Sequence, residues 1–105
     1  MSNDFNKVIL IGTVANNPEI TEKDGKRTTI VSVLTESEYT KDGKVVQTKE
    51  YTRCKAYGYN LDKCTALKEG SRVRIEGKLH SASWNQGDTK HTMTEVIVDT
   101  VVPLG

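Results

Sequence analysis

The most informative part of the chain is a short run in which aromatic and basic residues alternate with small ones. Every second position carries a ring or a cation, in the order Tyr51, Arg53, Lys55 and Tyr57. The positions between them hold Thr52, Cys54 and Ala56. Successive side chains of a β-strand point to opposite faces. A strand here would therefore present two rings and two cations together, while its other face enters the core.

Such a face suits unpaired nucleotides. Flat bases stack on aromatic rings for roughly 1–3 kcal/mol each, and the phosphates attract Lys and Arg. An apolar core does not accept cations such as Arg53 and Lys55 beside its aromatics. The run therefore predicts a nucleic-acid-binding strand. The alternative is that Tyr51 and Tyr57 half-cover the core and keep their hydroxyls in water.

Two further aromatic residues lie in polar surroundings. Trp84 is the only tryptophan and stands beside Gln86, Gly87 and Asp88, whereas Tyr39 lies shortly before an Asp-Gly turn. A tryptophan that serves the core is more often found among apolar neighbours. We expect both rings to lie on loops that extend the stacking surface, although each could also be an ordinary surface aromatic.

The sequence offers no catalytic or metal-binding motif. It contains no phosphate-binding glycine loop of the Walker type, no GxSxG and no HExxH. Cys54, Cys64, His80 and His91 include no CxxC pair, so zinc is not expected. The two cysteines are interpreted as small buried hydrophobes. We expect neither an enzyme nor a bound cofactor.

Basic residues concentrate in the middle of the chain. The net charge is +1, but residues 41–78 carry ten Lys or Arg against five Asp or Glu, and both flanking segments are acidic. Such an asymmetry attracts a polyanion, although ordinary solvated lysines would also explain it.

The composition of the 105 residues favours one small β domain, residues 1–105. Val, Ile and Thr number 30 in all, whereas Ala and Leu number ten, and branching at Cβ suits strands. The longest purely apolar run, residues 8–11, is far shorter than the ~20 residues that cross a bilayer. Residues 1–7 lack the apolar segment of a secretory signal. We therefore expect no membrane segment and a cytoplasmic location, which two cysteines without a signal also favour.

Apolar periodicity and turn residues predict five strands and one helix. The strands are expected at residues 8–11, 28–35, 46–57, 71–79 and 90–102. Leu61, Cys64 and Leu67 recur every three residues and predict a helix at 60–68. Two Lys-Asp-Gly-Lys turns, at 23–26 and 41–44, are hairpin signals. Residues 84–88 are expected to form a loop, and Pro103 to end the last strand.

This order of elements favours a closed barrel. An open five-stranded sheet would leave edges that pair with other chains, whereas closure removes most of them. The helix between the third and fourth strands can fill one open end. The arrangement is that of an all-β, five-stranded OB-fold barrel, a fold that binds oligonucleotides and oligosaccharides. Another small β-barrel is the alternative.

Several segments, in this order, resemble the bacterial-type single-stranded DNA-binding protein family. They are residues 6–12, 18–19, 35–37, 50–53, 57–58, 68–79 and 94–98, and the most specific is Lys-Glu-Gly-Ser-Arg-Val-Arg-Ile-Glu-Gly-Lys-Leu at 68–79. No single segment is decisive, but their order and spacing are. The resemblance covers nearly the whole chain, from Asn6 to about Val102.

The resemblance implies a protein that coats single-stranded DNA without strong sequence preference during replication, recombination and repair. The family's four stacking positions fall on Tyr39, Tyr51, Tyr57 and Trp84, and its basic positions on Lys7, Arg53 and Arg72. Alternation along the expected strands adds Lys55, Arg74 and Lys78 to the positive lining. An OB-fold accessory subunit that acts through protein contacts, as in a primosome, and an RNA binder are the alternatives.

The chain departs from the family in three places. His80, Ser81 and Ala82 stand where members often carry arginines, and Thr52 stands where many have a His at a subunit contact. The chain ends at Gly105 without the acidic tail that recruits other proteins, so tail-mediated recruitment is not expected. It is either a natural short form, as phages and plasmids encode, or a shortened chain. A homotetramer is expected, with a dimer as the alternative, in a bacterial or phage-infected cell.

Overall fold

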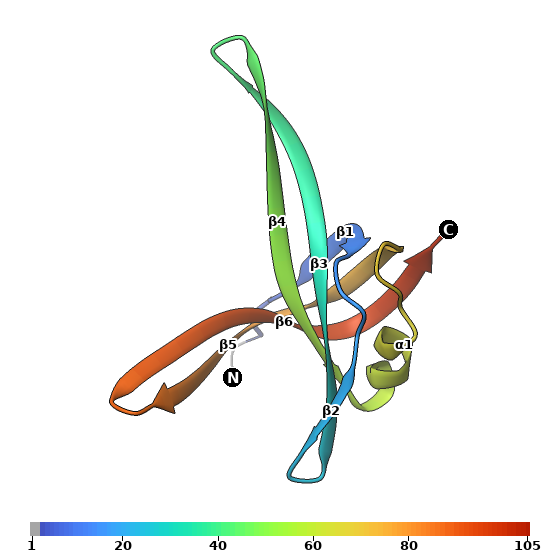
Figure 1. Cartoon of the computed structure of the whole chain (residues 1–105), viewed down its shortest axis with the longest axis vertical. Helices are drawn as coiled ribbons and strands as arrows, with labels where there is room; N and C mark the ends of the chain where they lie inside the picture. The colour runs from blue at the N-terminus through green and yellow to red at the C-terminus, as the bar shows by residue number, and fades with distance from the viewer. Residues whose placement is uncertain (1–2) are drawn as a thin grey trace.

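The computed structural model describes residues 3–105, so the first two residues of the expected domain lie outside it. It contains the strands β1 (Val8–Val14), β2 (Ile20–Lys23), β3 (Lys26–Lys41), β4 (Lys44–Tyr57), β5 (Arg72–Gln86) and β6 (Thr89–Leu104). A 3-10 turn (Gly58–Asn60) and the helix α1 (Leu61–Thr65) lie between β4 and β5. The strands form one sheet in the order β1-β5-β6-β4-β3-β2 (Figure 1).

The strand β1 closes this sheet into a barrel. It pairs with β5 over most of its length and then with β3, where Thr13 lies opposite Leu34 and Val14 opposite Val33. The buried side chains inside the barrel include Val14, Val31, Val33, Val73, Ile75 and Val96. The expected all-β, five-stranded OB-fold barrel is therefore confirmed, with β2 as a short additional strand.

Glycine permits a close approach of two strands at Gly12. A Cβ at this position would collide with the carbonyl oxygen of Leu34 and touch a methyl group of Val33. Both belong to β3, where β1 crosses over to close the barrel. The side chain is therefore absent at the point where two backbones meet.

The helix lies where the sequence predicts but is shorter than residues 60–68. Its Cys64, together with Leu67 just beyond it, joins the barrel core, as the three-residue spacing indicates. The side-chain amide of buried Asn60 donates to the carbonyl groups of Val98 and Asp99 in β6. This pair of hydrogen bonds anchors the start of the helix to the barrel.

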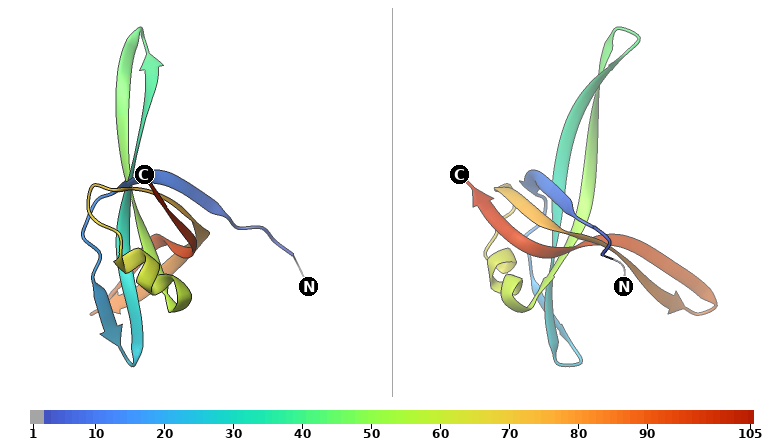
Figure 2. Two further views of the ribbon diagram at one scale, coloured as in Figure 1. Left: turned by 90° about the vertical axis from the view of Figure 1, so that its right-hand side faces the viewer. Right: turned by 180° about the vertical axis from the view of Figure 1, so that it is seen from behind.

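The two Asp-Gly turns are confirmed, and the hairpins that they close extend beyond the barrel as arms (Figure 2). Asp24 and Gly25 have φ values of 53° and 77°, and Asp42 and Gly43 have values of 52° and 77°. Two consecutive residues with positive φ are what a tight two-residue hairpin turn requires.

Several strands are longer than predicted, among them β1, which continues to Val14, and β3, which spans Lys26–Lys41. Residues 84–86 belong to β5 instead of a loop, and β6 continues through Pro103 to Leu104. β2 was not predicted at all. The tip of β5 protrudes and β2 lies at the edge of the sheet, and both are exposed, so neither has the alternation of buried apolar residues that reveals a strand. No helix within residues 3–105 is long and apolar enough to span a bilayer.

Candidate nucleic-acid interface

The alternating run of β4 lies as its sequence predicts. Tyr51 and Tyr57 are 63% and 51% exposed, whereas Cys54 and Ala56 between them are fully buried. Arg53 and Lys55 share the face of the two tyrosines, since alternate residues of one strand do. We call this side of the sheet the outer face. The rings are not used to fill the core.

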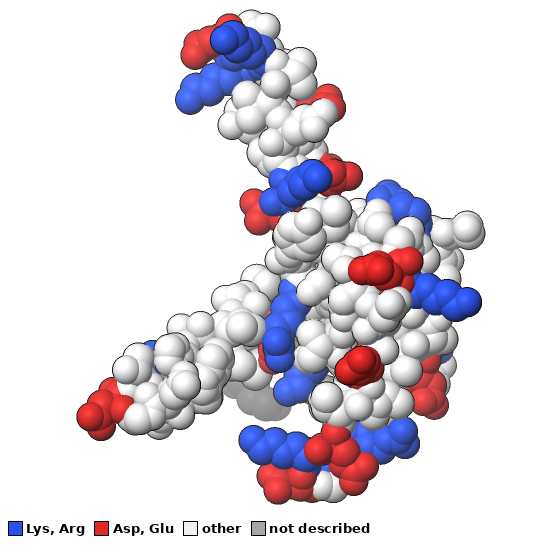
Figure 3. Space-filling view, in the orientation of Figure 1, with Lys and Arg blue, Asp and Glu red and all other residues white. Residues whose placement is uncertain are grey.

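The outer face continues from β4 across β6 to β5. Lys55 pairs with Ile97, and Ile97 pairs in turn with Lys78. Residues opposite each other on paired strands project to the same side. Lys78 therefore belongs to the outer face, and so does Trp84, six residues further along β5. Basic side chains gather where β4 crosses β6 (Figure 3).

Trp84 lies on the protruding β5–β6 arm, opposite His91. The two rings are stacked, with centroids 5.4 Å apart and planes at 20°. His91 covers one side of the indole, and the side chain as a whole remains exposed. The cross-strand stack fixes the orientation of the tryptophan, so that a base can stack on the remaining side without first ordering the ring.

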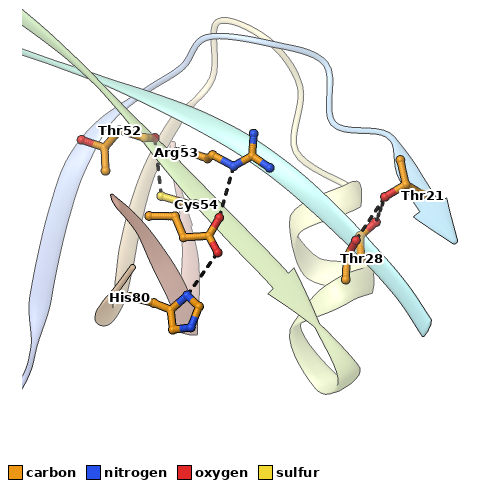
Figure 4. A network of polar contacts seen from close by, with 7 residues as sticks. Thr21, Thr28, Thr52, Arg53, Cys54 and His80 are labelled. Atoms are coloured by element: carbon orange, nitrogen blue, oxygen red, sulfur yellow. Dashed lines mark hydrogen bonds and ion pairs between the residues drawn. The ribbon is translucent and has the colours of Figure 1, made fainter. Parts of the chain in front are cut away.

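Arg53 is held by a carboxylate that the sequence does not reveal. Its Nε donates to Glu95 Oε2 at 3.2 Å, and His80 Nδ1 lies 3.3 Å from Glu95 Oε1 (Figure 4). Glu95 is only 2% exposed, and a buried carboxylate requires partners of this kind. The contact positions the guanidinium on the outer face, but it also offsets part of its positive charge.

A second carboxylate pairs with two other predicted phosphate ligands. Glu76 contacts Lys7 Nζ at 3.0 Å and Arg74 Nη2 at 3.2 Å. The hydrogen bond from Lys7, aided by the charges of Arg74 and Lys7, lowers the pKa of Glu76 below its ordinary value of 4.5. Nearby, Arg72 Nη1 donates to Thr13 Oγ1 at 3.2 Å.

These three basic residues lie apart from the aromatic rings. Lys7 precedes β1, and Arg72 and Arg74 begin β5, whereas Trp84 lies near the far end of that strand. Arg72 and Trp84 are twelve residues apart, up to about 40 Å at the rise of a strand. The structure thus brings Tyr51, Tyr57, Arg53, Lys55, Lys78 and Trp84 onto one continuous face, and it places Lys7, Arg72 and Arg74 at the β1–β5 side of the barrel.

Tyr39 does not share the outer face. It lies opposite Val46 in the β3–β4 ribbon, whereas Tyr51 lies opposite Leu34. Because residues alternate along both strands, Tyr39 projects from the side of the ribbon that carries Val33 in the barrel. Its ring is exposed on the free part of the arm, so a strand bound to Tyr51 would have to pass around the arm to reach it.

Two lysines on the outer face were not predicted. Lys23 of β2 pairs with Lys26 of β3, and Thr28 of β3 pairs with Tyr57 of β4. Alternation places Lys26, Thr28 and Tyr57 on one side, and Lys23 with them. The sequence predicts the turn at 23–26 but not the strand β2, and without that strand the direction in which Lys23 and Lys26 project could not be predicted.

Comparison with known proteins gives consistent matches. The model of the Single-strand binding protein family matches residues 5–104. Single-stranded DNA-binding protein 1 of Chlorobaculum tepidum is 36% identical over 111 residues, covering 100% of this chain and 68% of that protein. The single-stranded DNA-binding protein of Staphylococcus epidermidis is 30% identical over 100 residues, covering 92% of this chain and 74% of that protein.

Two solved structures share the fold. One is the Plasmodium falciparum SSB complex with ssDNA, with a TM-score of 0.88 at 24% identity, covering 100% of this chain and 99% of that chain. The other is a deletion mutant of the single-stranded DNA binding protein from Thermus aquaticus, with a TM-score of 0.83 at 22% identity. It is matched over 96% of this chain and 51% of its own length. At these identities the likeness concerns the fold alone.

Proposed function

The chain belongs to the single-strand binding protein family, and on that premise we propose that it binds single-stranded DNA without strong sequence preference. Its role is to coat unpaired strands during replication, recombination and repair. The observation that carries the proposal is the outer face of β4, where exposed Tyr51 and Tyr57 flank Arg53 and Lys55. Residues 1–105 act together as one binding domain.

Binding follows from the two chemistries that the outer face combines. Bases stack on Tyr51, Tyr57 and Trp84, and each stack contributes roughly 1–3 kcal/mol whatever the base. Phosphates lie against Lys55, Lys78 and the outer nitrogens of Arg53. A duplex keeps its bases inside its own stack, so the rings select unpaired strands. The binding is non-enzymatic and needs no cofactor, and the protein acts in the cytoplasm.

The proposed active form is a homotetramer, with a dimer as the alternative. Within residues 3–105, β1 pairs with β5 along one edge and reaches β3 only at Thr13 and Val14. The rest of its second edge is open, and Ile9 and Ile11 beside it are 52% and 53% exposed. An open, apolar edge of this kind pairs readily with another chain. Joined copies would present a longer DNA-binding surface. A strand bound to one copy would be held at a high effective concentration near the next copy.

The fluorescence of Trp84 tests the proposal directly, because it is the only tryptophan. A single strand of about 35 nucleotides, enough for several OB domains, should quench its emission, and the matched duplex should not. Tyr51→Ala should weaken binding by roughly 1–3 kcal/mol, about 5- to 150-fold. Tyr59→Ala is the matched control, since Tyr59 is an exposed tyrosine beside α1 whose ring contacts Lys63.

The same titrations separate the alternatives. Tighter binding to a matched RNA strand would replace DNA with RNA as the ligand, since stacking does not distinguish the two sugars. Weak binding that is insensitive to Tyr51→Ala would favour an accessory subunit that acts through protein contacts. Equal affinity for duplex and single strand would overturn the proposal.

A further inference from the structure

A basic groove lies at the base of the β2–β3 hairpin, next to Tyr57. We call it the hairpin groove and define it by Lys23, Lys26, Thr28, Lys55 and Tyr57. Two adjoining open hollows share Lys26, Thr28 and Lys55, and the larger, which also includes Tyr57, has a volume of about 560 Å³. That volume falls within the range of roughly 300–1,000 Å³ that is typical of ligand sites.

The hairpin groove continues the outer face without a break. Thr21 pairs with Thr28, Thr28 with Tyr57, and Ile30 with Lys55. A nucleotide whose base is stacked on Tyr57 therefore has its neighbour over the threonines and lysines of the hairpin. The Thr21 and Thr28 hydroxyls lie 3.1 Å apart (Figure 4) and form a polar floor.

The cations of the groove have no acidic partner in residues 3–105. None of the ion pairs there involves Lys23, Lys26 or Lys55, whereas Lys7, Arg53 and Arg74 each contact a carboxylate. Lys23, Lys26, Lys55 and Arg27 line the two hollows together with one carboxylate, that of Asp24. Basic and acidic side chains can both be seen around the tip of this hairpin (Figure 3). The balance within the groove remains strongly positive.

We propose that the hairpin groove binds the phosphodiester backbone of the nucleotides that follow the base stacked on Tyr57. The inference rests on the proposed function and extends it, because it assigns phosphate contacts to Lys23 and Lys26 of a hairpin whose first strand, β2, the sequence did not reveal. Ammonium groups act as point charges toward phosphate oxygens. Because neither lysine is held in an ion pair within residues 3–105, whereas Lys7 and Arg74 are both paired with Glu76, these lysines are better phosphate ligands than Lys7 or Arg74.

The chain provides its own matched control for this proposal. The turn at 41–44 has the same sequence, Lys-Asp-Gly-Lys, and the same positive φ values as the turn at 23–26. It lies at the opposite end of β3, on the far tip of the β3–β4 arm. By alternation, Lys44 also projects from the side of the ribbon opposite to Tyr51.

The experiment compares Lys23→Gln/Lys26→Gln with Lys41→Gln/Lys44→Gln in titrations of oligo-dT at 50 to 200 mM salt. Each lost phosphate contact lowers the log–log salt slope by about 0.7. The magnitude of the salt slope should therefore be smaller by about 1.4 in the groove variant than in the wild type. When the salt rises from 50 to 200 mM, the factor by which the wild type loses affinity should then be about seven times the factor for the variant. The control variant should keep the wild-type slope. Both pairs are exposed, and circular dichroism should show unchanged folds.

Chemical acetylation of lysines gives a second measurement. Bound oligo-dT should protect Lys23, Lys26 and Lys55 and leave Lys41 and Lys44 reactive. Equal slope changes in the two variants, no change in either, or no protection of the groove lysines would overturn the proposal. If wild-type protein fails to bind oligo-dT at all, the proposed function itself fails, and the groove proposal with it.

Discussion

Half of the cations that the sequence assigns to DNA are bonded to carboxylates in the folded protein. Arg53 contacts Glu95, and Lys7 and Arg74 share Glu76. The alternation along β4 predicts which way Arg53 points, because that is a local property of a strand. The alternation does not predict the contact with Glu95, which lies 42 residues away in the sequence and is brought next to Arg53 by the pairing of β4 with β6. Charge counts along a sequence therefore overstate the charge available to a ligand.

The cluster at Glu76 makes stability depend on pH in a defined direction. Its pKa is lowered in the folded protein, first by the hydrogen bond from Lys7. The folded state thus holds the proton less tightly than the unfolded chain, and the stabilisation is present above the ordinary pKa of 4.5. It is lost as the pH falls from there through the lowered value.

We expect Glu76→Gln to lower the free energy of unfolding at pH 7 and to approach the wild type at pH values below the lowered pKa of Glu76, where both side chains are neutral. Urea unfolding between these pH values measures the difference. Lys7→Gln removes the same hydrogen bond by changing the donor. It should make the free energy of unfolding depend less on pH over the same acid range. A difference between wild type and Glu76→Gln that stays constant with pH would contradict this account.

At the scale of the elements, short apolar strands and turns could be predicted, but protruding strands could not. Val31, Val33, Val73 and Ile75 lie inside the barrel, so their strands show the expected alternation. Residues 84–86 belong to an arm with solvent on both sides, where no pattern of burial marks the strand. Trp84 was correctly singled out as an exposed ring but wrongly placed on a loop. Tyr39 was assigned to the same surface, and only the register shows that it projects from the other side of its ribbon.

The two glycines at strand crossings lead to a prediction for the barrel. A Cβ at Gly77, beside the irregularity in the β5–β6 pairing, would collide with the carbonyl oxygen of Ile97, as one at Gly12 would with that of Leu34. Backbone cannot move aside as a flexible side chain does. Gly12→Ala and Gly77→Ala should each cost at least about 2 kcal/mol of unfolding free energy, as overpacking of a core does.

Gly87→Ala is the control for both substitutions. A Cβ there meets nothing within 4 Å, and only its φ of +62° opposes a side chain, which costs about 1 kcal/mol. Urea unfolding curves of the three variants provide the comparison. Barrel glycine variants no less stable than Gly87→Ala would show that β1 and β5 can be displaced without opening the barrel.

At the scale of the whole molecule, the open edge of β1 is the place where the proposed homotetramer or dimer is expected to form its contact. Ile9 and Ile11 lie beside Glu76 and Arg74 on β5, so a partner pairing with β1 would meet both apolar and charged groups. Ile9→Lys/Ile11→Lys should reduce the mass in solution below that of the wild type, because like charges would face each other where β1 strands of two copies meet.

Light scattering measures this mass, and Val45→Lys is the control, since Val45 is an exposed apolar residue on the distant β3–β4 arm. An unchanged mass in the double variant would place the contact elsewhere. A wild-type protein that stays a single chain at every concentration would contradict the proposed homotetramer and dimer alike.

The long β3–β4 and β5–β6 arms also govern how the molecule moves through a solvent. Its radius of gyration is 15.9 Å, whereas a compact chain of this length has about 13 Å, because β3–β4 and β5–β6 project far from the barrel (Figure 1). Protrusions raise frictional drag without adding mass. A single subunit should therefore elute from a sizing column ahead of compact standards of 11.7 kDa, and its elution volume taken alone would overestimate its mass.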